Sequence, residues 1–97
     1  MDIKIHSAVE IDEKFREYIN EKFGKLGKFI FGKGQAELYI KKEGHMFLSE
    51  IKITSKNPTI FIEEKNDDLN TGIEILYDRA KRQLRKLHDK STEIPHS

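Results

Sequence analysis

The spacing of apolar residues constrains the fold of this 97-residue chain more than any other feature of the sequence. Four short segments alternate apolar with polar residues, the pattern of a strand with one buried face, at residues 1–6, 36–41, 47–53 and 59–63. Two longer segments repeat apolar residues every three or four positions, the period of an amphipathic helix, at residues 12–26 and 68–90. We therefore predict an α+β fold with the order strand-helix-strand-strand-strand-helix, in which a four-stranded sheet has both helices packed on one face.

Residue types that cap helices or form turns stand between these segments. A short polar side chain can accept hydrogen bonds from the free N–H groups at a helix start, and glycine or proline ends regular structure. We expect N-caps at Asp12 and at Asp67 or Asp68, a left-handed helix end at Gly27, and turns at residues 43–44 and 57–58.

The composition indicates one small globular domain. The residues are 36% charged and 36% hydrophobic, which is too apolar for a disordered chain and too polar for a membrane protein. No apolar run approaches the roughly 20 residues of a membrane helix, and the first ten residues lack the apolar stretch of a signal peptide. We expect a cytoplasmic protein without membrane contact, a single domain over residues 1–90, and a disordered tail over residues 91–97, which lack periodicity.

The charges are unevenly distributed although the net charge is only +1. Residues 63–74 contain five acids and one lysine, whereas residues 79–90 contain six lysines and arginines. At about 100° per residue, four of these cations share the side of the helix away from its apolar residues: Arg79, Arg82, Lys86 and Lys90. The helix dipole favours cations by about 0.3–1 kcal/mol, but only within the last turn. We therefore interpret this longer row as an anion-binding face.

No group of residues has the spacing of a catalytic, metal or nucleotide site. Catalysis needs a nucleophile, a base and an orienting partner, and the serines lack such a context. The four histidines are never at metal-ligand spacing, and the run GKG at residues 32–34 lacks the rest of a phosphate loop. The following strand partly resembles an RNA-recognition motif, but Gln35 and Glu37 replace the stacking aromatic residues. We expect neither an enzyme nor a metal, cofactor or small-molecule substrate.

Two segments resemble a known protein family: VEIDEKFREYINEKFGKLGKF, residues 9–29, and DDLNTGIEILYDRAKRQLRKLHDK, residues 67–90. Together with the order of the strands, they resemble the ribosome hibernation promoting factors, also called ribosome-associated inhibitors or sigma-54 modulation proteins, over residues 2–90. This resemblance implies a domain that lodges between the head and body of the small ribosomal subunit. There it would occupy the path of messenger and transfer RNA and inhibit translation during starvation or stationary phase.

The resemblance also implies which residues contact ribosomal RNA. The basic residues of the family match Arg79, Arg82, Lys86 and Lys90 on the second helix, and Arg16, Lys22 and Lys25 on the first. With two neighbouring cations, the expected RNA-binding set is Arg16, Lys22, Lys25, Lys28, Arg79, Arg82, Arg85, Lys86 and Lys90. Two positions depart from the family pattern: Asn70 replaces a frequent aromatic residue, and His88 replaces a lysine.

The expected partners are the RNA of the small ribosomal subunit and ribosomal proteins. Acids around the first helix would repel RNA and could face a cationic ribosomal protein, although acids at a helix start also favour the helix dipole. The chain lacks the second domain by which long members of the family pair two ribosomes, so we expect a short, monomeric form. The alternatives are a general double-stranded-RNA-binding module and a protein-interaction domain that uses the acidic first helix.

Overall fold

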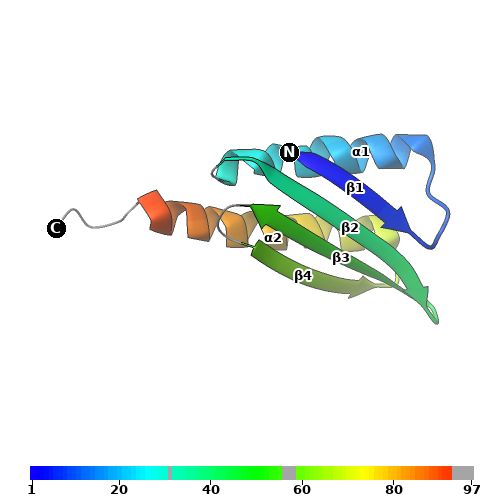
Figure 1. The fold of residues 1–97 in the computed structure, drawn as a ribbon. Coiled ribbons are helices and arrows are strands. Elements are labelled where there is room, and N and C mark those ends of the chain that lie inside the picture. The colour runs from blue at the N-terminus through cyan, green and yellow to red at the C-terminus, as the bar shows by residue number, and fades with distance from the viewer. Residues whose placement is uncertain (31, 56–58, 93–97) are drawn as a thin grey trace.

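The computed structural model describes residues 1–30, 32–55 and 59–92, and the side chains among these up to Asp89. The described residues form four strands, two α-helices and one short 3-10 helix (Figure 1). In chain order they are β1 (Asp2–Ser7), α1 (Glu13–Gly24), η1 (Lys25–Phe29), β2 (Gly34–Glu43), β3 (Met46–Ser55), β4 (Thr59–Asn66) and α2 (Leu69–Thr92). The predicted order of strands and helices is confirmed.

The second predicted turn and most of the predicted tail cannot be compared with the structure. Residues 57–58 and residues 93–97 lie outside the described residues. Ser91 and Thr92, which the sequence placed in the tail, still belong to α2. Within the described residues, neither helix has an apolar stretch long enough to cross a membrane.

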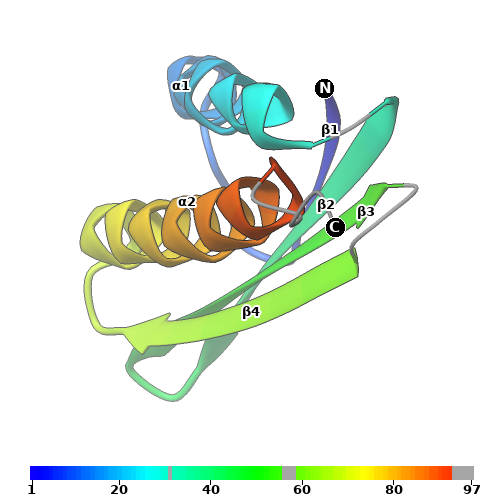
Figure 2. The ribbon, with the colours of Figure 1, turned by 90° about the vertical axis from the view of Figure 1, so that its left-hand side faces the viewer.

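One four-stranded sheet carries both helices on the same face (Figure 2). The strands are ordered β1-β2-β3-β4, in which β1 and β2 are parallel and the other neighbours are antiparallel. Parallel strands cannot be joined by a tight hairpin, so α1 and η1 form part of the crossover from β1 to β2. The turn expected at residues 43–44 is confirmed, and Gly44 takes a left-handed φ of 61° there.

Two apolar rows that cross all four strands form the sheet side of the core. They are Ile5, Leu38, Ile51 and Ile62, and Ile3, Ala36, Ile53 and Ile60. The helices and η1 cover these rows with buried residues at the predicted spacing: Ile19, Phe23, Leu26, Ile73, Leu76, Ala80 and Leu84. Full burial of a large apolar side chain contributes about 1.5–3 kcal/mol, so this layer is the main stabilising contact of the fold.

Both helices begin at residues predicted to be N-caps. The Asp12 carboxylate accepts a hydrogen bond from the N–H of Phe15 at an N···O distance of 2.8 Å. The Asp68 carboxylate accepts one bond from the Thr71 hydroxyl at 2.5 Å and one from the Thr71 N–H at 2.8 Å. The hydroxyl bond, and then the N–H bond, hold the pKa of Asp68 below its usual value because they stabilise the charged carboxylate.

The prediction for Gly27 is wrong, because the chain does not turn left-handed there. It tightens instead into the 3-10 helix η1, and among the described residues only Gly32 and Gly44 have a positive φ. The close neighbour of Gly27 is the start of the chain, since an added Cβ atom would lie 3.3 Å from the Cβ atom of Met1. The absence of a side chain lets the residue before β1 approach η1 closely.

Side chains from the two helices meet at Lys22. Its ammonium lies 3.0 Å from the Glu74 carboxylate of α2 and 4.5 Å from the centre of the Tyr77 ring. The Tyr77 ring also packs edge-on against buried Phe23, with 5.5 Å between the ring centres. We call Lys22, Phe23, Glu74 and Tyr77 the helix clamp. The clamp joins two helices that run in the same direction, so both begin toward one end of the sheet and end toward the other (Figure 1).

Replacing Asp68 with alanine should lower the melting temperature at pH 7, because the first turn of α2 loses its cap. The pKa of Asp68 is lowered in the folded state, so its contribution to stability is present above the ordinary value of 3.8 and is lost as the pH falls through the folded value. The difference from the native protein should therefore shrink as the pH falls below 3.8 in thermal unfolding followed by circular dichroism. Asp67→Ala is the matched control, and an equal loss in that variant would contradict the assignment of the cap.

Replacing Lys22 with alanine should lower the free energy of unfolding by about 1 kcal/mol. The change removes one partly exposed ion pair and two cation–π contacts, to Tyr77 and to Tyr18, each of which contributes up to about 1 kcal/mol. Urea unfolding measures the loss. Lys25→Ala, three residues later and exposed, should change stability little, so equal losses in both variants would show that the clamp does not hold the helices.

Candidate nucleic-acid interface

Three cations of α2 lie together beside the edge strand β4. Arg79, Arg82 and Lys86 line a shallow depression of about 450 Å³ with Gln83 of the same helix and Ile62 of β4. Their spacing of three and four residues places them on one side of the helix, as the sequence predicts. Three of the four residues of the predicted row therefore lie together along the edge of the sheet.

Arg79 anchors this row to the sheet. Its Nη1 atom donates to the main-chain oxygen of Glu63 at 2.5 Å and lies 3.0 Å from the Glu64 carboxylate. A guanidinium has five N–H donors, so Arg79 can keep these contacts and still offer N–H groups to an anion. Arg82 and Lys86 are exposed, and neither forms an ion pair within the described part of the chain. The row therefore combines one anchored cation with two available ones.

The flank of α2 next to this row carries further basic residues. Arg85 is exposed, whereas Lys81 and His88 are half-buried. The His88 ring packs edge-on against Phe29 of η1, with 6.2 Å between ring centres, and its Nδ1 atom lies 3.6 Å from the Asp89 carboxylate. This contact brings the last turns of α2 against η1. The last turns of α2 and the 3-10 helix η1 therefore lie at the same end of the molecule (Figure 1).

A second group of lysines surrounds η1. Lys25 and Lys28 line a depression of about 720 Å³ together with Lys33, a residue that sequence reasoning did not select. Met1 and Asp2 also border this depression, because the start of the chain packs against η1. The run GKG is the only sequence signal for Lys33, and it does not indicate that the lysine lies beside η1. We call Lys25, Lys28 and Lys33 the η1 cluster.

The other residues expected to bind RNA lie apart from these two groups. Lys22 belongs to the helix clamp, where Glu74 and Tyr77 already contact its ammonium. Arg16 is half-buried in α1 and borders neither depression. Lys90 follows Lys86 by about one helical turn, but its side chain lies outside the described part.

The parallel helices place opposite charges at the two ends of the molecule. Cations gather where η1 and α2 end, and acids gather where α1 and α2 begin: Glu10, Asp12, Glu13, Asp67 and Asp68. The helix dipoles favour both arrangements within about one turn of each helix end. A polyanion would be attracted to one end and repelled from the other, so this distribution orients the protein.

The uncovered face of the sheet has a less suitable surface for a polyanion. Lys52 lies there between Glu37 and the exposed Phe61, and the Tyr39 ring stacks on His6 with 4.7 Å between ring centres. The Tyr39 hydroxyl donates to the Glu37 carboxylate at 2.6 Å, which lowers the pKa of Glu37 and raises that of Tyr39. Because charges of both signs mix here and Tyr39 is already engaged, we place the candidate interface on the helices.

Comparisons with known proteins support a family assignment. Residues 3–92 match the family described as "Sigma 54 modulation protein / S30EA ribosomal protein". A curated relative, the "Ribosome hibernation promotion factor" of Staphylococcus aureus (strain COL), is 35% identical over 79 residues. The alignment covers 78% of this chain but 42% of that protein, so the chain spans less than half the length of this relative.

Two solved structures share the fold. The crystal structure of the N-terminal domain of Thermus thermophilus Protein Y has a TM-score of 0.76 and 23% identity, covering 89% of this chain and 94% of that one. A ribosomal subunit interface protein from Coxiella burnetii has a TM-score of 0.78 and 18% identity, covering 90% of this chain and 97% of that one. At these identities the likeness shows the fold alone, and it agrees with the predicted architecture.

The family match extends over nearly the whole chain, and the curated relative supports it at the level of sequence identity. The family consists of ribosome-associated proteins and not of enzymes, which confirms the expectation of a non-enzymatic protein. The resemblance seen in the two helical segments is therefore confirmed, and the chain belongs to the family of sigma-54 modulation and S30EA ribosomal proteins.

Proposed function

We propose that this chain is a ribosome hibernation factor that binds the small ribosomal subunit in the cytoplasm. It occupies the path of messenger and transfer RNA and so inhibits translation under starvation or in stationary phase. Support comes from the family and from the relative named for hibernation promotion. The observation that carries the proposal is the row of Arg79, Arg82 and Lys86 beside β4.

The chemistry of this row suits the phosphates of folded RNA. An A-form helix hides its base edges in a deep, narrow groove, so proteins recognise it mostly by shape and by contacts to the backbone. An arginine fork can donate two parallel hydrogen bonds to a phosphate, and lysine adds a compact charge. Arg82 and Lys86 are exposed on a helix that packs against the core, so both can bind without rearrangement of the fold. Arg79, Arg85 and Lys90 extend the same proposed contact.

The η1 cluster supplies a second proposed contact. Phosphate contacts fix the orientation of a protein on RNA, and two separate groups of contacts fix it better than one. The packing of His88 against Phe29 connects the η1 segment to α2, so the two groups belong to one packed unit. Arg16 is a proposed peripheral contact, whereas Lys22 supports the site by holding the helices.

Inhibition in this proposal needs no chemical step. A domain that fills the path of messenger and transfer RNA excludes both by its volume, and it leaves when its phosphate contacts are weakened. Such binding releases counterions from the RNA, so affinity falls steeply as the salt concentration rises. The extent of inhibition therefore equals the fraction of ribosomes that the factor occupies.

A general double-stranded-RNA-binding module is a second candidate. It is favoured by the observation that the proposed contacts come from cations on helices, which would bind any RNA backbone. Competition distinguishes the two functions, because an excess of free RNA duplex should leave a ribosome factor on the small subunit but should displace a general duplex binder.

Replacing both Arg82 and Lys86 with glutamate should weaken binding to purified small subunits by roughly 100-fold or more, because each charge-assisted contact contributes about 1.5–3 kcal/mol. The loss of two phosphate contacts should also flatten the dependence of log affinity on log salt by roughly 1 to 2 units. Sedimentation through sucrose at several salt concentrations measures both effects.

Lys52→Glu with Lys4→Glu is the matched control, since it reverses two exposed cations on the uncovered sheet face. It should bind nearly as well as the native protein. If the α2 variant binds like the native protein while the sheet variant does not, the interface lies on the sheet.

A further inference from the structure

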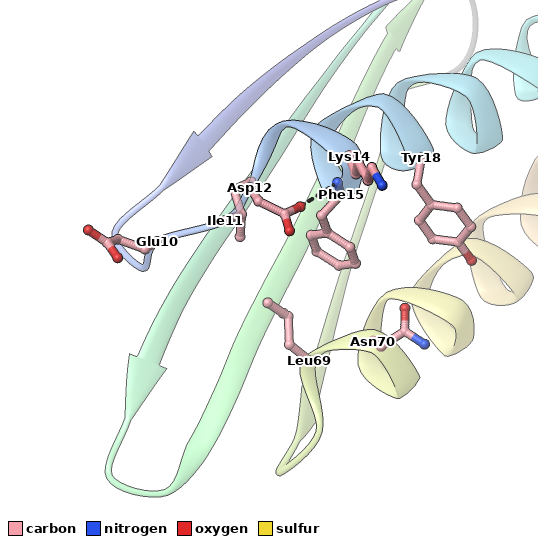
Figure 3. A pocket seen from close by; sticks show the side chains of 8 residues that line it. All are labelled: Glu10, Ile11, Asp12, Lys14, Phe15, Tyr18, Leu69 and Asn70. Carbon is pink, nitrogen blue, oxygen red and sulfur yellow. Dashed lines mark hydrogen bonds between the residues drawn. The ribbon is translucent and has the colours of Figure 1, made fainter.

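A groove opens between the first turns of α1 and α2, at the acidic end of the molecule (Figure 3). Its volume is about 590 Å³, and its apolar lining consists of Ile11, Phe15, Tyr18 and Leu69. The rings of Phe15 and Tyr18 lie nearly parallel, with 6.0 Å between their centres, and both point toward α2. The polar residues that border the groove are Glu10, Asp12, Lys14 and Asn70.

The groove exists because the described contacts between the two helices lie beyond their first turns, at the helix clamp. Past Tyr18, the next turn of α1 carries Lys22, which closes the space between the helices through Glu74 and Tyr77. Nearer the helix starts, the short side chain of Asn70 leaves the groove open. Four apolar residues that are only half-buried remain next to water there, which costs free energy unless another surface covers them.

The surroundings of the groove are acidic. The two helix starts, residues 10–14 and 67–70, contain five acids and a single lysine, Lys14. Asp12 and Asp68 are explained as N-caps. Glu10, Glu13 and Asp67 have no such role, and none of them forms an ion pair within the described residues.

This combination of charge and apolar surface selects one class of partner. RNA phosphates would be repelled, and an anionic membrane surface would be repelled for the same reason. A protein segment rich in lysine and arginine is attracted by the acids, and one large apolar side chain on it can fill the space beside Phe15 and Tyr18. Proteins that bind RNA commonly carry such basic extensions.

We propose that the groove docks a basic segment of a ribosomal protein, which inserts one large apolar side chain between Phe15, Tyr18 and Leu69. This inference rests on the proposed function, since it requires that the chain binds the small subunit. With the cations of α2 and the η1 cluster against RNA, the groove lies at the end that faces away from those contacts. In this proposal one end of the molecule binds ribosomal RNA and the other end binds a ribosomal protein.

Photo-crosslinking on purified small subunits tests the partner directly. Benzoylphenylalanine replaces exposed Asn70 at the border of the groove, and in a control protein it replaces exposed Lys52 on the sheet. We expect position 70 to crosslink to a lysine- and arginine-rich segment of a ribosomal protein, identified by mass spectrometry. Crosslinks from position 70 to ribosomal RNA or to a second copy of the chain would overturn the inference, as would no crosslink from a protein that co-sediments.

A titration without ribosomes tests the groove separately from the proposed function. The probe is a short synthetic peptide in which one tryptophan is flanked by lysines and arginines, and a peptide with glutamates in their place is the control. Amide chemical shifts should change around Phe15, Tyr18 and Leu69 with the basic peptide only. Equal changes with both peptides, or no saturable change, would overturn the inference while leaving co-sedimentation with the small subunit intact.

A pair of charge-reversal variants tests the role of the acids. Glu10→Lys with Glu13→Lys reverses one acid at the border of the groove and one beside it at the start of α1. It should raise the dissociation constant of the basic peptide by roughly 3- to 10-fold, because such exposed charges contribute modestly. Glu17→Lys with Glu21→Lys changes the net charge equally but alters exposed acids that do not border the groove, and it should have a smaller effect. Equal effects of the two variants would show that only the overall charge matters, which contradicts docking at the groove.

Discussion

The parallel direction of the two helices is the constraint on which the charge distribution depends. The sheet sets this direction, because each helix runs antiparallel to the strand before it, and those strands, β1 and β4, point the same way. Because the helices are parallel, their N-terminal ends lie together and their C-terminal ends lie together. The dipoles then favour acids at one end of the molecule and cations at the other. Antiparallel helices would have placed unlike charges at both ends.

This separation of charge explains how a nearly neutral protein could bind a polyanion in one orientation. A net charge of +1 gives little general attraction to RNA, so affinity must come from local groups of cations. The row beside β4 and the η1 cluster are two such groups on one packed unit. The acids at the opposite end then disfavour reversed binding. In this account the cations provide the affinity for RNA, and the acids fix the orientation in which the protein binds.

Sequence reasoning predicted the features that depend on residues near one another in the chain. The alternation of strand residues, the helical period and the caps at Asp12 and Asp68 are local, and the structure has them. The row of Arg79, Arg82 and Lys86 was also predictable, because its members share one side of one helix. These predictions need only the geometry of single elements.

The features that sequence reasoning missed depend on contacts between distant segments. Gly27 packs closely against Met1 and does not form a left-handed turn, which no local pattern reveals. Lys33 joins the η1 cluster only because the crossover brings the start of β2 beside η1. Likewise the contact of Arg79 with Glu63 could not be read from one helix, because it depends on the packing of α2 against β4.

Competition on the small ribosomal subunit tests the central claim most directly. The protein is sedimented at low salt with purified small subunits that are either vacant or already loaded with messenger RNA and initiator transfer RNA. The account predicts that the protein binds vacant subunits and is excluded from loaded ones, because both would occupy the same path. Equal binding to vacant and loaded subunits would contradict it.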